Sequence, residues 1–323
     1  MAETLEDYAL TRKMQKKGSI QKVGIVGCGQ MGQEICRIIS QFGMDAIYLD
    51  ISEEKVKLIY EHIKQQLDDE INRWGLTQGE KKAILSRIKG TTDYSDLADC
   101  DIVLESVNSK KPGSNLESRK DVFKRIEAVV GPDALITSNN STLMISEIAA
   151  ILEKPERAIG LHFMSPATTV KIVEVVKGIE TSQKTFEIVC KFAKMIDRKV
   201  IGINESPGHI STRLIVTLIN EACELLMEGV ASVENIDKTM KQGYSMQYGP
   251  FELADKIGLD KVVKWMDNLY TEYSLMKFKA SPVIKRLVRA KYYGKKVGKG
   301  FYRYDESGKI TGETIISAEF KLQ

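Results

Sequence analysis

Residues 21–52 decide the fold, and they read QKVGIVGCGQMGQEICRIISQFGMDAIYLDIS. An apolar run, KVGIV, opens this stretch and has the length and composition of a buried strand. A glycine-rich turn and a helical segment follow it, and AIYLD returns to an apolar strand. This order of strand, turn, helix and strand predicts a βαβ unit, the building block of a parallel sheet.

The turn of this unit has the form GxGxxG over residues 27–32. Gly27 permits a tight turn, Gly29 lets the backbone approach a pyrophosphate, and Gly32 lets helix and strand pack closely. The helix N-terminus presents unpaired N–H groups that attract an anion, and we expect Gln30 and Met31 to contact it as well. The motif therefore predicts a dinucleotide-binding turn.

The next strand of the unit ends at Asp50. An acid at this place accepts hydrogen bonds from an adenosine ribose and repels a 2′-phosphate, so we expect NAD rather than NADP as the cofactor. Two alternatives share the fingerprint, namely a turn of this shape without a cofactor and a turn that binds FAD. FAD enzymes usually carry the motif at the extreme N-terminus of a larger chain, which disfavours FAD here.

Strand-like and helix-like segments continue to alternate up to residue 204, with strands at DIVLESV, ALITSNN, AIGLHFM and KIVEVVKG. This alternation predicts the α/β class, with a doubly wound Rossmann-type parallel sheet. A break at SPG then precedes a long helical pattern, and helical segments continue to about residue 290, which predicts a second, all-helical C-terminal domain. We expect a surface arm over residues 1–20, an NAD-binding domain over 21–204 and the helical domain over 205–323.

Composition argues against several other classes of protein. The 47 basic residues nearly balance the 44 acidic ones, so the chain has no strong positive field to attract nucleic acid. No apolar run approaches the ~18 residues that span a bilayer, and the histidines and cysteines are too scattered for a metal site. Five cysteines without a CxxC pair, and a first segment unlike a signal peptide, indicate a cytoplasmic setting.

Three histidines compete for the role of an acid-base residue, which removal of a hydride from a secondary alcohol requires. His62 falls in a charged helical stretch and is expected to be a solvated surface residue. His209 follows a Pro-Gly break and is either near a cleft or structural. His162 ends an apolar strand, AIGLHF, and open α/β sheets bind ligands at such strand ends. Position therefore favours His162.

Glu174 lies twelve residues after His162, inside the otherwise apolar run KIVEVV. A carboxylate in such a strand is costly unless it is paired, so we expect it to have a partner. A histidine on the adjacent strand would be a natural partner, and the hydrogen bond with the carboxylate would fix the tautomer of its ring. A structural ion pair with Lys171 or Lys177 is the alternative.

In these stretches the sequence resembles the 3-hydroxyacyl-CoA dehydrogenase family, which includes the bacterial 3-hydroxybutyryl-CoA dehydrogenases. The resemblance runs from the glycine turn to near the C-terminus and is carried, in order, by GCGQMG, TSNNSTL, GLHFMSP, KIVEVVKG, SPGHISTRL, YGPFELADKIGLD and GKKVGKGFYRY. It implies an NAD-dependent dehydrogenase that interconverts a short-chain 3-hydroxyacyl-CoA and its 3-ketoacyl-CoA. It also implies a homodimer formed by the helical domain, which closes a cleft over the acyl-CoA substrate.

The resemblance further assigns residues to the site. It implies that His162 is the catalytic acid-base residue, that Glu174 holds it, and that Ser141 reaches the 3-oxygen of the substrate. The cofactor side would include Asn139, close to the nicotinamide, together with Glu105 and Arg119, the latter where the family carries a lysine. Arg73 falls where the family tends to place a basic residue for the phosphates of CoA.

Three positions depart from the family pattern. Thr212 stands in PGHISTR where the family has an asparagine that joins the catalytic group around the substrate carbonyl. Ser165 replaces an asparagine beside the substrate, and Ser109 stands where a second glutamate is expected after Glu105. Threonine offers one hydroxyl where asparagine offers both an amide donor and a carbonyl acceptor, so the substrate contacts are expected to differ.

Two other functions remain open from the sequence. The first is a dehydrogenase of a free 3-hydroxy acid, of the gulonate or carnitine type, which shares the fold and the His-Glu pair. The second is a weakly active or inactive NAD-binding paralogue, which the substitution at Thr212 supports.

Overall fold

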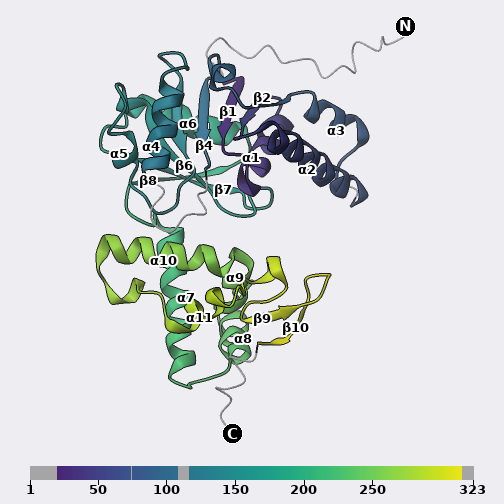
Figure 1. Cartoon of the computed structure of the whole chain (residues 1–323), viewed down its shortest axis with the longest axis vertical. Coiled ribbons are helices and arrows are strands. Elements are labelled where there is room, and N and C mark those ends of the chain that lie inside the picture. Colours follow the sequence, from purple (N-terminus) through teal and green to yellow (C-terminus); the bar gives the residue numbers. More distant parts are fainter. Residues whose placement is uncertain (1–19, 74, 108–115, 315–323) are drawn as a thin grey trace.

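The computed structural model describes residues 20–73, 75–107 and 116–314. The expected N-terminal arm, apart from Ile20, lies outside the described residues, and so does Ser109. Two bodies make up the described chain, an upper one built on a large sheet and a lower one built of helices (Figure 1). No helix of the described ranges is long and apolar enough to cross a membrane.

The upper body is an eight-stranded sheet in the order β3-β2-β1-β4-β5-β6-β7-β8. Its strands are β1 (Lys22–Val26), β2 (Asp45–Leu49), β3 (Ile88–Thr91), β4 (Ile102–Glu105), β5 (Leu135–Ser138), β6 (Ala158–Phe163), β7 (Ile172–Lys177) and β8 (Lys199–Asn204). All neighbours are parallel except β6 and β7, which are antiparallel. The predicted doubly wound sheet is thus confirmed as mostly parallel.

The antiparallel pair has a simple physical cause. Only residues 164–171 connect β6 to β7, and no helix lies between them. A parallel crossover needs a dozen or more residues, so this short connection must return the chain in the opposite direction. The register of the pair sets His162 directly opposite Glu174.

Helices cover both faces of the sheet: α1 (Gln30–Gln41), α2 (Glu53–Asn72), α3 (Gln78–Leu85) and α6 (Gln183–Met195) on one, α4 (Leu116–Glu127) and α5 (Ile145–Ala149) on the other. Successive strand residues point to opposite faces, so Ile25 packs under the first group and Val26 under the second. The long helix α2 buries an apolar stripe at spacings of three and four residues, while His62 on the same helix is exposed, as predicted.

The lower body comprises α7 (Ser211–Met227), α8 (Val233–Gly243), α9 (Pro250–Ile257), α10 (Leu259–Tyr273) and α11 (Pro282–Arg289) around a core of its own. It is helical as predicted, with one addition, a two-stranded antiparallel sheet of β9 (Tyr302–Tyr304) and β10 (Ile310–Glu313). Four short 3-10 turns occur in the described chain. The upper body contains η1 (Tyr94–Leu97) and η2 (Pro155–Arg157), and the lower body contains η3 (Met276–Phe278) and η4 (Lys295–Val297).

A buried carboxylate joins the small sheet to the helices. Asp255 on α9 accepts hydrogen bonds from the backbone N–H groups of Phe301 and Tyr302, each at 2.9 Å, and from the hydroxyl of Tyr304 at 3.0 Å. A Cβ at Gly300 would lie 1.9 Å from Asp255 Oδ1, so only glycine fits there. The motifs YGPFELAD and GKGFYRY are therefore two halves of one structural contact.

This contact makes stability depend on pH. Burial raises the pKa of Asp255 to about 7 and that of Asp237 on α8 to about 6, from an ordinary value of 3.8. Because the folded-state pKa values lie above the unfolded ones, the folded protein binds these protons more tightly. The contribution of both carboxyls to the free energy of unfolding is therefore largest below pH ~4 and is lost as pH rises towards ~7.

We expect Asp255→Asn to reduce this dependence, because an amide does not titrate in this range. The variant should also be less stable overall, since the amide N–H₂ cannot accept from both backbone donors. Urea unfolding at several pH values between 4 and 8 measures the slope. Asp305→Asn, at an exposed turn residue, should keep the wild-type slope, and an unchanged slope in Asp255→Asn would contradict the assignment.

Candidate active site

The glycine turn has the backbone geometry that a dinucleotide-binding turn requires. Gly27 has φ of 87°, and a Cβ there would lie 2.8 Å from the backbone of Val107. A Cβ at Gly32 would lie 2.6 Å from the carbonyl oxygen of Gly27, so helix α1 packs against the turn without room for a side chain. At Gly29, the N-cap of α1, a Cβ would meet nothing within 4 Å. The turn is thus open on the side of Gly29.

The acid at the end of β2 supports this turn. Asp50 Oδ2 accepts a hydrogen bond from the backbone N–H of Cys28 at 3.1 Å, inside the glycine motif. Its Oδ1 accepts from the backbone N–H of Ile51 at 2.8 Å and lies 3.6 Å from Lys55 Nζ. Of the two residues that begin α1, Gln30 is exposed and bonds to Glu34. Met31, the other, lines the neighbouring cleft.

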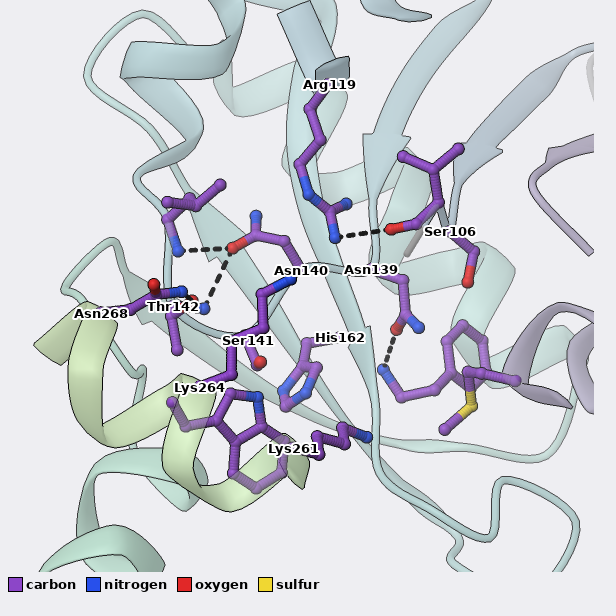
Figure 2. A pocket seen from close by; sticks show the side chains of 15 residues that line it. Ser106, Arg119, Asn139, Asn140, Ser141, Thr142, His162, Lys261, Lys264 and Asn268 are labelled. Atoms are coloured by element: carbon purple, nitrogen blue, oxygen red, sulfur yellow. Dashed lines mark hydrogen bonds between the residues drawn. The ribbon is translucent and has the colours of Figure 1, made fainter. Parts of the chain in front are cut away.

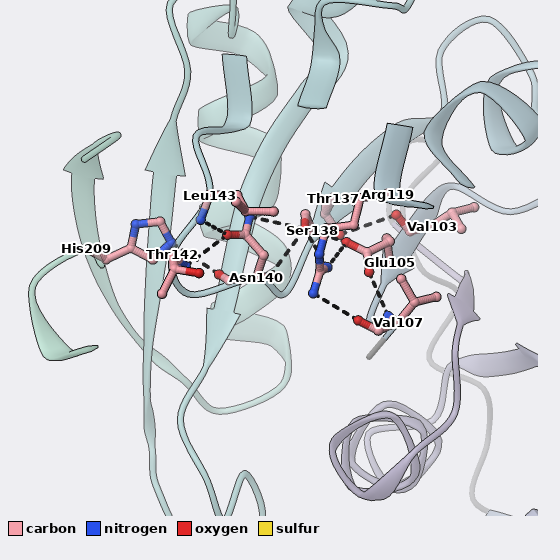
Figure 3. A network of polar contacts seen from close by, with 10 residues as sticks. All are labelled: Val103, Glu105, Val107, Arg119, Thr137, Ser138, Asn140, Thr142, Leu143 and His209. Carbon is pink, nitrogen blue, oxygen red and sulfur yellow. Dashed lines mark hydrogen bonds and ion pairs between the residues drawn. The ribbon is translucent and has the colours of Figure 1, made fainter. Parts of the chain in front are cut away.

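A buried ion pair lies at the carboxyl end of β4. Glu105 is fully buried and pairs with Arg119 of α4, and it also accepts from the hydroxyl of Ser138 and the backbone N–H of Val107, both at 2.6 Å. Arg119 donates in addition to the carbonyl oxygen of Val107 at 2.9 Å. Figure 3 shows this network at the ends of neighbouring strands. Glu105 and Arg119, predicted separately for the cofactor side, are thus one unit.

The loop after β5 is the continuation of that network. Ser138 Oγ accepts from the backbone N–H of Asn140 at 3.2 Å, and Asn140 Oδ1 in turn accepts from the backbone N–H groups of Thr142 and Leu143 at 3.1 and 2.7 Å. These bonds hold the loop that carries Ser141 (Figure 3). Sequence reasoning missed Asn140, although its place in TSNNSTL, after a predicted strand, was a usable signal.

The histidine and the carboxylate meet across the antiparallel pair. His162 Nδ1 lies 2.7 Å from Glu174 Oε2, and both side chains are buried. Ser211, at the start of α7, donates to Glu174 from its backbone N–H at 2.9 Å and from its hydroxyl at 3.1 Å. Burial opposes the ionised carboxylate, but the hydrogen bonds from His162 and Ser211 hold the pKa of Glu174 well below its ordinary value.

This geometry defines which ring nitrogen of His162 is available. A neutral imidazole whose Nδ1 faces an ionised carboxylate carries its proton on Nδ1, which leaves Nε2 as the acceptor. The alternative partners of Glu174 are engaged elsewhere, since Lys171 pairs with Asp197 and Lys177 bonds to Gln183. Glu174 is therefore paired with the histidine rather than with a lysine.

A cleft between the two bodies brings the predicted side chains together (Figure 2). The upper wall includes Ser106, Arg119, Asn139, Ser141, His162 and Phe163, and helix α10 supplies the lower wall with Lys261, Lys264, Trp265 and Asn268. Asn268 Nδ2 donates to Thr142 Oγ1 at 2.9 Å and so connects the two walls. The four residues of α10 were not predicted, because they carry no motif.

His209 lies directly beside the pair of His162 and Glu174. Its ring centre is 5.5 Å from that of His162, and its Nε2 and Nδ1 each lie 3.2 Å from a backbone carbonyl oxygen, of Asn140 and Ser206 respectively. Burial lowers the pKa of His209 to about 4, with the neighbouring His162 as the next cause. His209 is therefore neutral near pH 7 and ties the start of α7 to the loop of Ser141.

Two predicted substrate residues, Arg73 and Ser165, and one predicted catalytic residue, Thr212, do not line this cleft. Arg73 is exposed at the C-terminal end of α2, and Ser165 is exposed after β6. Thr212 is buried in the first turn of α7, where the contact with Glu174 comes from its neighbour Ser211. The structure thus brings His162, Ser141, Arg119 and Asn139 together in one cleft, and it leaves these three outside.

A sheet whose glycine turn opens beside a polar cleft is the arrangement of an NAD-binding oxidoreductase. Comparison with known proteins agrees. The model of the NAD binding domain of 3-hydroxyacyl-CoA dehydrogenases matches residues 22–206, and the model of their C-terminal domain matches residues 208–304. The chain belongs to the 3-hydroxyacyl-CoA dehydrogenase family.

Individual relatives span nearly the same length. The 3-hydroxybutyryl-CoA dehydrogenase of Bradyrhizobium diazoefficiens is 36% identical over 88% of this chain and 96% of its own. The enzyme of the same name from Clostridioides difficile is 34% identical over 88% of this chain and all of its own length. The crystal structure of (S)-3-hydroxybutyryl-CoA dehydrogenase from Ralstonia eutropha is 36% identical, covers 89% of this chain and all of its own, and has a TM-score of 0.82.

Alanine substitutions at Gly29 and Gly32 should have separate effects, the first on cofactor binding and the second on stability. Gly29→Ala should fold with an unchanged unfolding temperature, because its Cβ meets nothing, yet bind NADH at least about tenfold more weakly, because the methyl group occupies the pyrophosphate's approach. Gly32→Ala should lose about 1–3 kcal/mol of stability, because its Cβ overlaps the Gly27 carbonyl. Thermal unfolding and fluorescence titration with NADH measure both effects.

Gly79→Ala serves as the matched control for this pair. Gly79 lies in the exposed helix α3, and its added Cβ also meets nothing within 4 Å. It should change neither the unfolding temperature by much nor the affinity for NADH. Wild-type affinity in Gly29→Ala would show that the pyrophosphate does not approach this turn.

Proposed function

We propose that the protein interconverts a short-chain 3-hydroxyacyl-CoA and the corresponding 3-ketoacyl-CoA, with NAD as the hydride carrier and His162 as the acid-base residue. The observation that carries this proposal is the buried pair of His162 and ionised Glu174, which lies in the same cleft as Ser141. The substrate class follows from the relatives described above, which are all named 3-hydroxybutyryl-CoA dehydrogenases.

The proton-transfer step follows from the geometry of the pair. In the oxidative direction, His162 Nε2 accepts the proton of the 3-hydroxyl group as the C3–H bond breaks and the carbonyl forms. Glu174 keeps Nδ1 protonated and stabilises the imidazolium that results. Ser141 donates a hydrogen bond to the 3-oxygen. Bound NAD supplies the acceptor for the hydride, and in the reductive direction His162 returns the proton.

The residues of the cofactor side have separate proposed tasks. The turn from Gly27 to Gly32, with Gln30 and Met31 at the start of α1, holds the pyrophosphate, and Asp50 binds the adenosine ribose. The glycine turn is open on the side of Gly29, which lets the pyrophosphate approach the backbone closely. Glu105, Arg119 and Asn139 face the nicotinamide end. There, Asn139 Oδ1 already accepts from the backbone N–H of Phe163 at 2.8 Å, which leaves its amide N–H₂ for a ligand.

Assembly and the remaining substrate contacts are also proposals. We place the domain division at Glu205, between β8 and α7, and assign dimer formation to an exposed apolar face of α7. This face includes Leu214 and, at the N-cap just before the helix, Ile210, which are 65% and 47% exposed. An apolar helix face of this kind is a typical homodimer surface. Arg73 and Ser165 stay assigned to the parts of the acyl-CoA that extend beyond the cleft.

The first test is NADH oxidation with acetoacetyl-CoA, longer 3-ketoacyl-CoAs and free 3-keto acids. The wild type should reduce the thioesters and be inhibited by free CoA, whereas a dehydrogenase of free 3-hydroxy acids would not be inhibited. His162→Ala should lose about 10²–10⁴-fold in kcat, because positioned proton transfer is removed, and should still bind NADH. NADH binding without turnover of any thioester would leave the inactive paralogue as the better description.

A second test concerns the departure at Thr212. Thr212→Asn should raise kcat with a 3-ketoacyl-CoA. Buried Thr212 does not line the cleft, and the longer asparagine side chain offers an amide donor for the developing oxyanion. The affinity for NADH should not change. Thr239→Asn, at an exposed position of α8, is the control and should behave as wild type. Equal kcat in the Thr212 and Thr239 variants would refute a catalytic role for Thr212.

A further inference from the structure

The two carboxylate oxygens of Glu174 have different hydrogen-bond donors. Oε1 accepts from the backbone N–H of Ser211 at 2.9 Å. Oε2 accepts from the hydroxyl of Ser211 at 3.1 Å, and the same oxygen lies 2.7 Å from His162 Nδ1. The hydroxyl of Ser211 therefore shares one oxygen with the histidine, whereas the backbone N–H binds the other.

The position of Ser211 in the helical body adds to this effect. Ser211 is the first residue of α7, a helix of 17 residues. A helix N-terminus carries roughly half a positive charge, because its first N–H groups have no partner inside the helix. The second body thus places a partial positive charge, an N–H group and a hydroxyl against the carboxylate of Glu174. All three reduce the negative charge that Glu174 offers to His162.

Glu174 stays ionised even without one of these contacts. Burial opposes its ionisation, but the hydrogen bond and charge of His162 and the backbone N–H of Ser211 lower its pKa to about 2. Loss of the hydroxyl therefore leaves the carboxylate charged near neutral pH. What changes is how strongly the carboxylate attracts a second proton on the imidazole ring.

The other titratable and charged groups around His162 do not depend on this hydroxyl. His209 is neutral near pH 7, because burial lowers its pKa to about 4. The cations that line the cleft together with His162 are Arg119 of α4 and Lys261 and Lys264 of α10. A substitution that removes only the hydroxyl of Ser211 leaves all of these groups in place.

We propose that Ser211 is a positioning residue whose hydroxyl sets the pH range in which His162 acts as a base. The hydroxyl orients Glu174 Oε2 and compensates part of the negative charge that would otherwise stabilise the imidazolium. His162 then remains ready to accept the proton of the 3-hydroxyl group down to a lower pH than with Glu174 alone. This inference rests on the proposed dehydrogenase function and adds a residue of the helical body to its proton-transfer step.

The pH profile of kcat/KM for oxidation of 3-hydroxybutyryl-CoA by NAD tests the proposal, because it reports the protonation of the free enzyme. In Ser211→Ala, the acid limb should move up by about 0.5–1 pH unit, since a carboxylate with one hydrogen bond fewer attracts the imidazolium proton more strongly. Rates on that limb then fall about three- to tenfold, while the plateau changes by less than about twofold. Ser211→Thr keeps a hydroxyl and should restore the wild-type profile.

Histidine NMR gives a second readout that needs no turnover. The chain has three histidines, so the signal of His162 can be assigned by its loss in His162→Ala. The titration midpoint of this signal in the free protein should rise in Ser211→Ala by the same amount as the acid limb. His62, on the exposed face of α2, is the internal reference and should titrate at the same pH in both proteins.

Ser146→Ala is the matched control. The hydroxyl of Ser146 also donates to a carboxylate between the two bodies, that of Glu205, which lies outside the cleft lined by His162. Its loss should leave the acid limb and the His162 midpoint at the wild-type pH. Circular dichroism and the unfolding temperature establish that each variant is folded.

Two readouts distinguish a failure of the proposed function from a failure of the role of Ser211. If no thioester is turned over, the dehydrogenase function fails, and the NMR midpoint still decides whether Ser211 acts on His162. If turnover occurs but Ser211→Ala is slower by the same factor at every pH, with both midpoints unchanged, the dehydrogenase stands and Ser211 is merely structural. A shift of the acid limb to lower pH would also refute the inference.

Discussion

The ionised carboxylate of Glu174 is the interaction on which the arrangement of the site depends. It is buried in a sheet, where an unpaired charge would be very costly, and three hydrogen bonds from His162 and Ser211 compensate it. The donors come from β6 and from the first turn of α7, so the carboxylate connects the sheet to the helical body. Its charge also fixes the tautomer of His162, with the proton on Nδ1 and Nε2 left as the acceptor.

Further contacts place the helical body against the sheet at the same edge. His209 reaches the carbonyl of Asn140, Asn268 bonds to Thr142, and Glu205 accepts from the backbone N–H of Ser146 at 2.8 Å. The first two involve the loop after β5, which the network of Ser138 and Asn140 already stiffens. The cleft thus lies where both bodies contact the short loop after β5. For this reason, the side chains that line the cleft come from residues far apart in the chain.

Much of this could be predicted because it follows from local pattern. The βαβ unit, the glycine turn and Asp50 are close in sequence, and the backbone requirements of Gly27 and Gly32 are the same in any such turn. Glu174 could be expected to have a partner, because a charged residue in an apolar strand needs one, and His162 was one of the candidates. The direction of β7 was not predicted as antiparallel, although the short link over residues 164–171 required it.

The sequence by itself determined the fold class and the cofactor, and it predicted His162 as the acid-base residue. These inferences rest on periodicity, on spacing within one motif, and on the position of His162 at a strand end. Only the tertiary structure decided which side chains share the cleft. The position of His209, the contact of Ser211 with Glu174, and the lysines of α10 depend on how the second body packs on the first. Such contacts join residues more than 30 positions apart, and no local pattern records the angle at which two packed bodies meet.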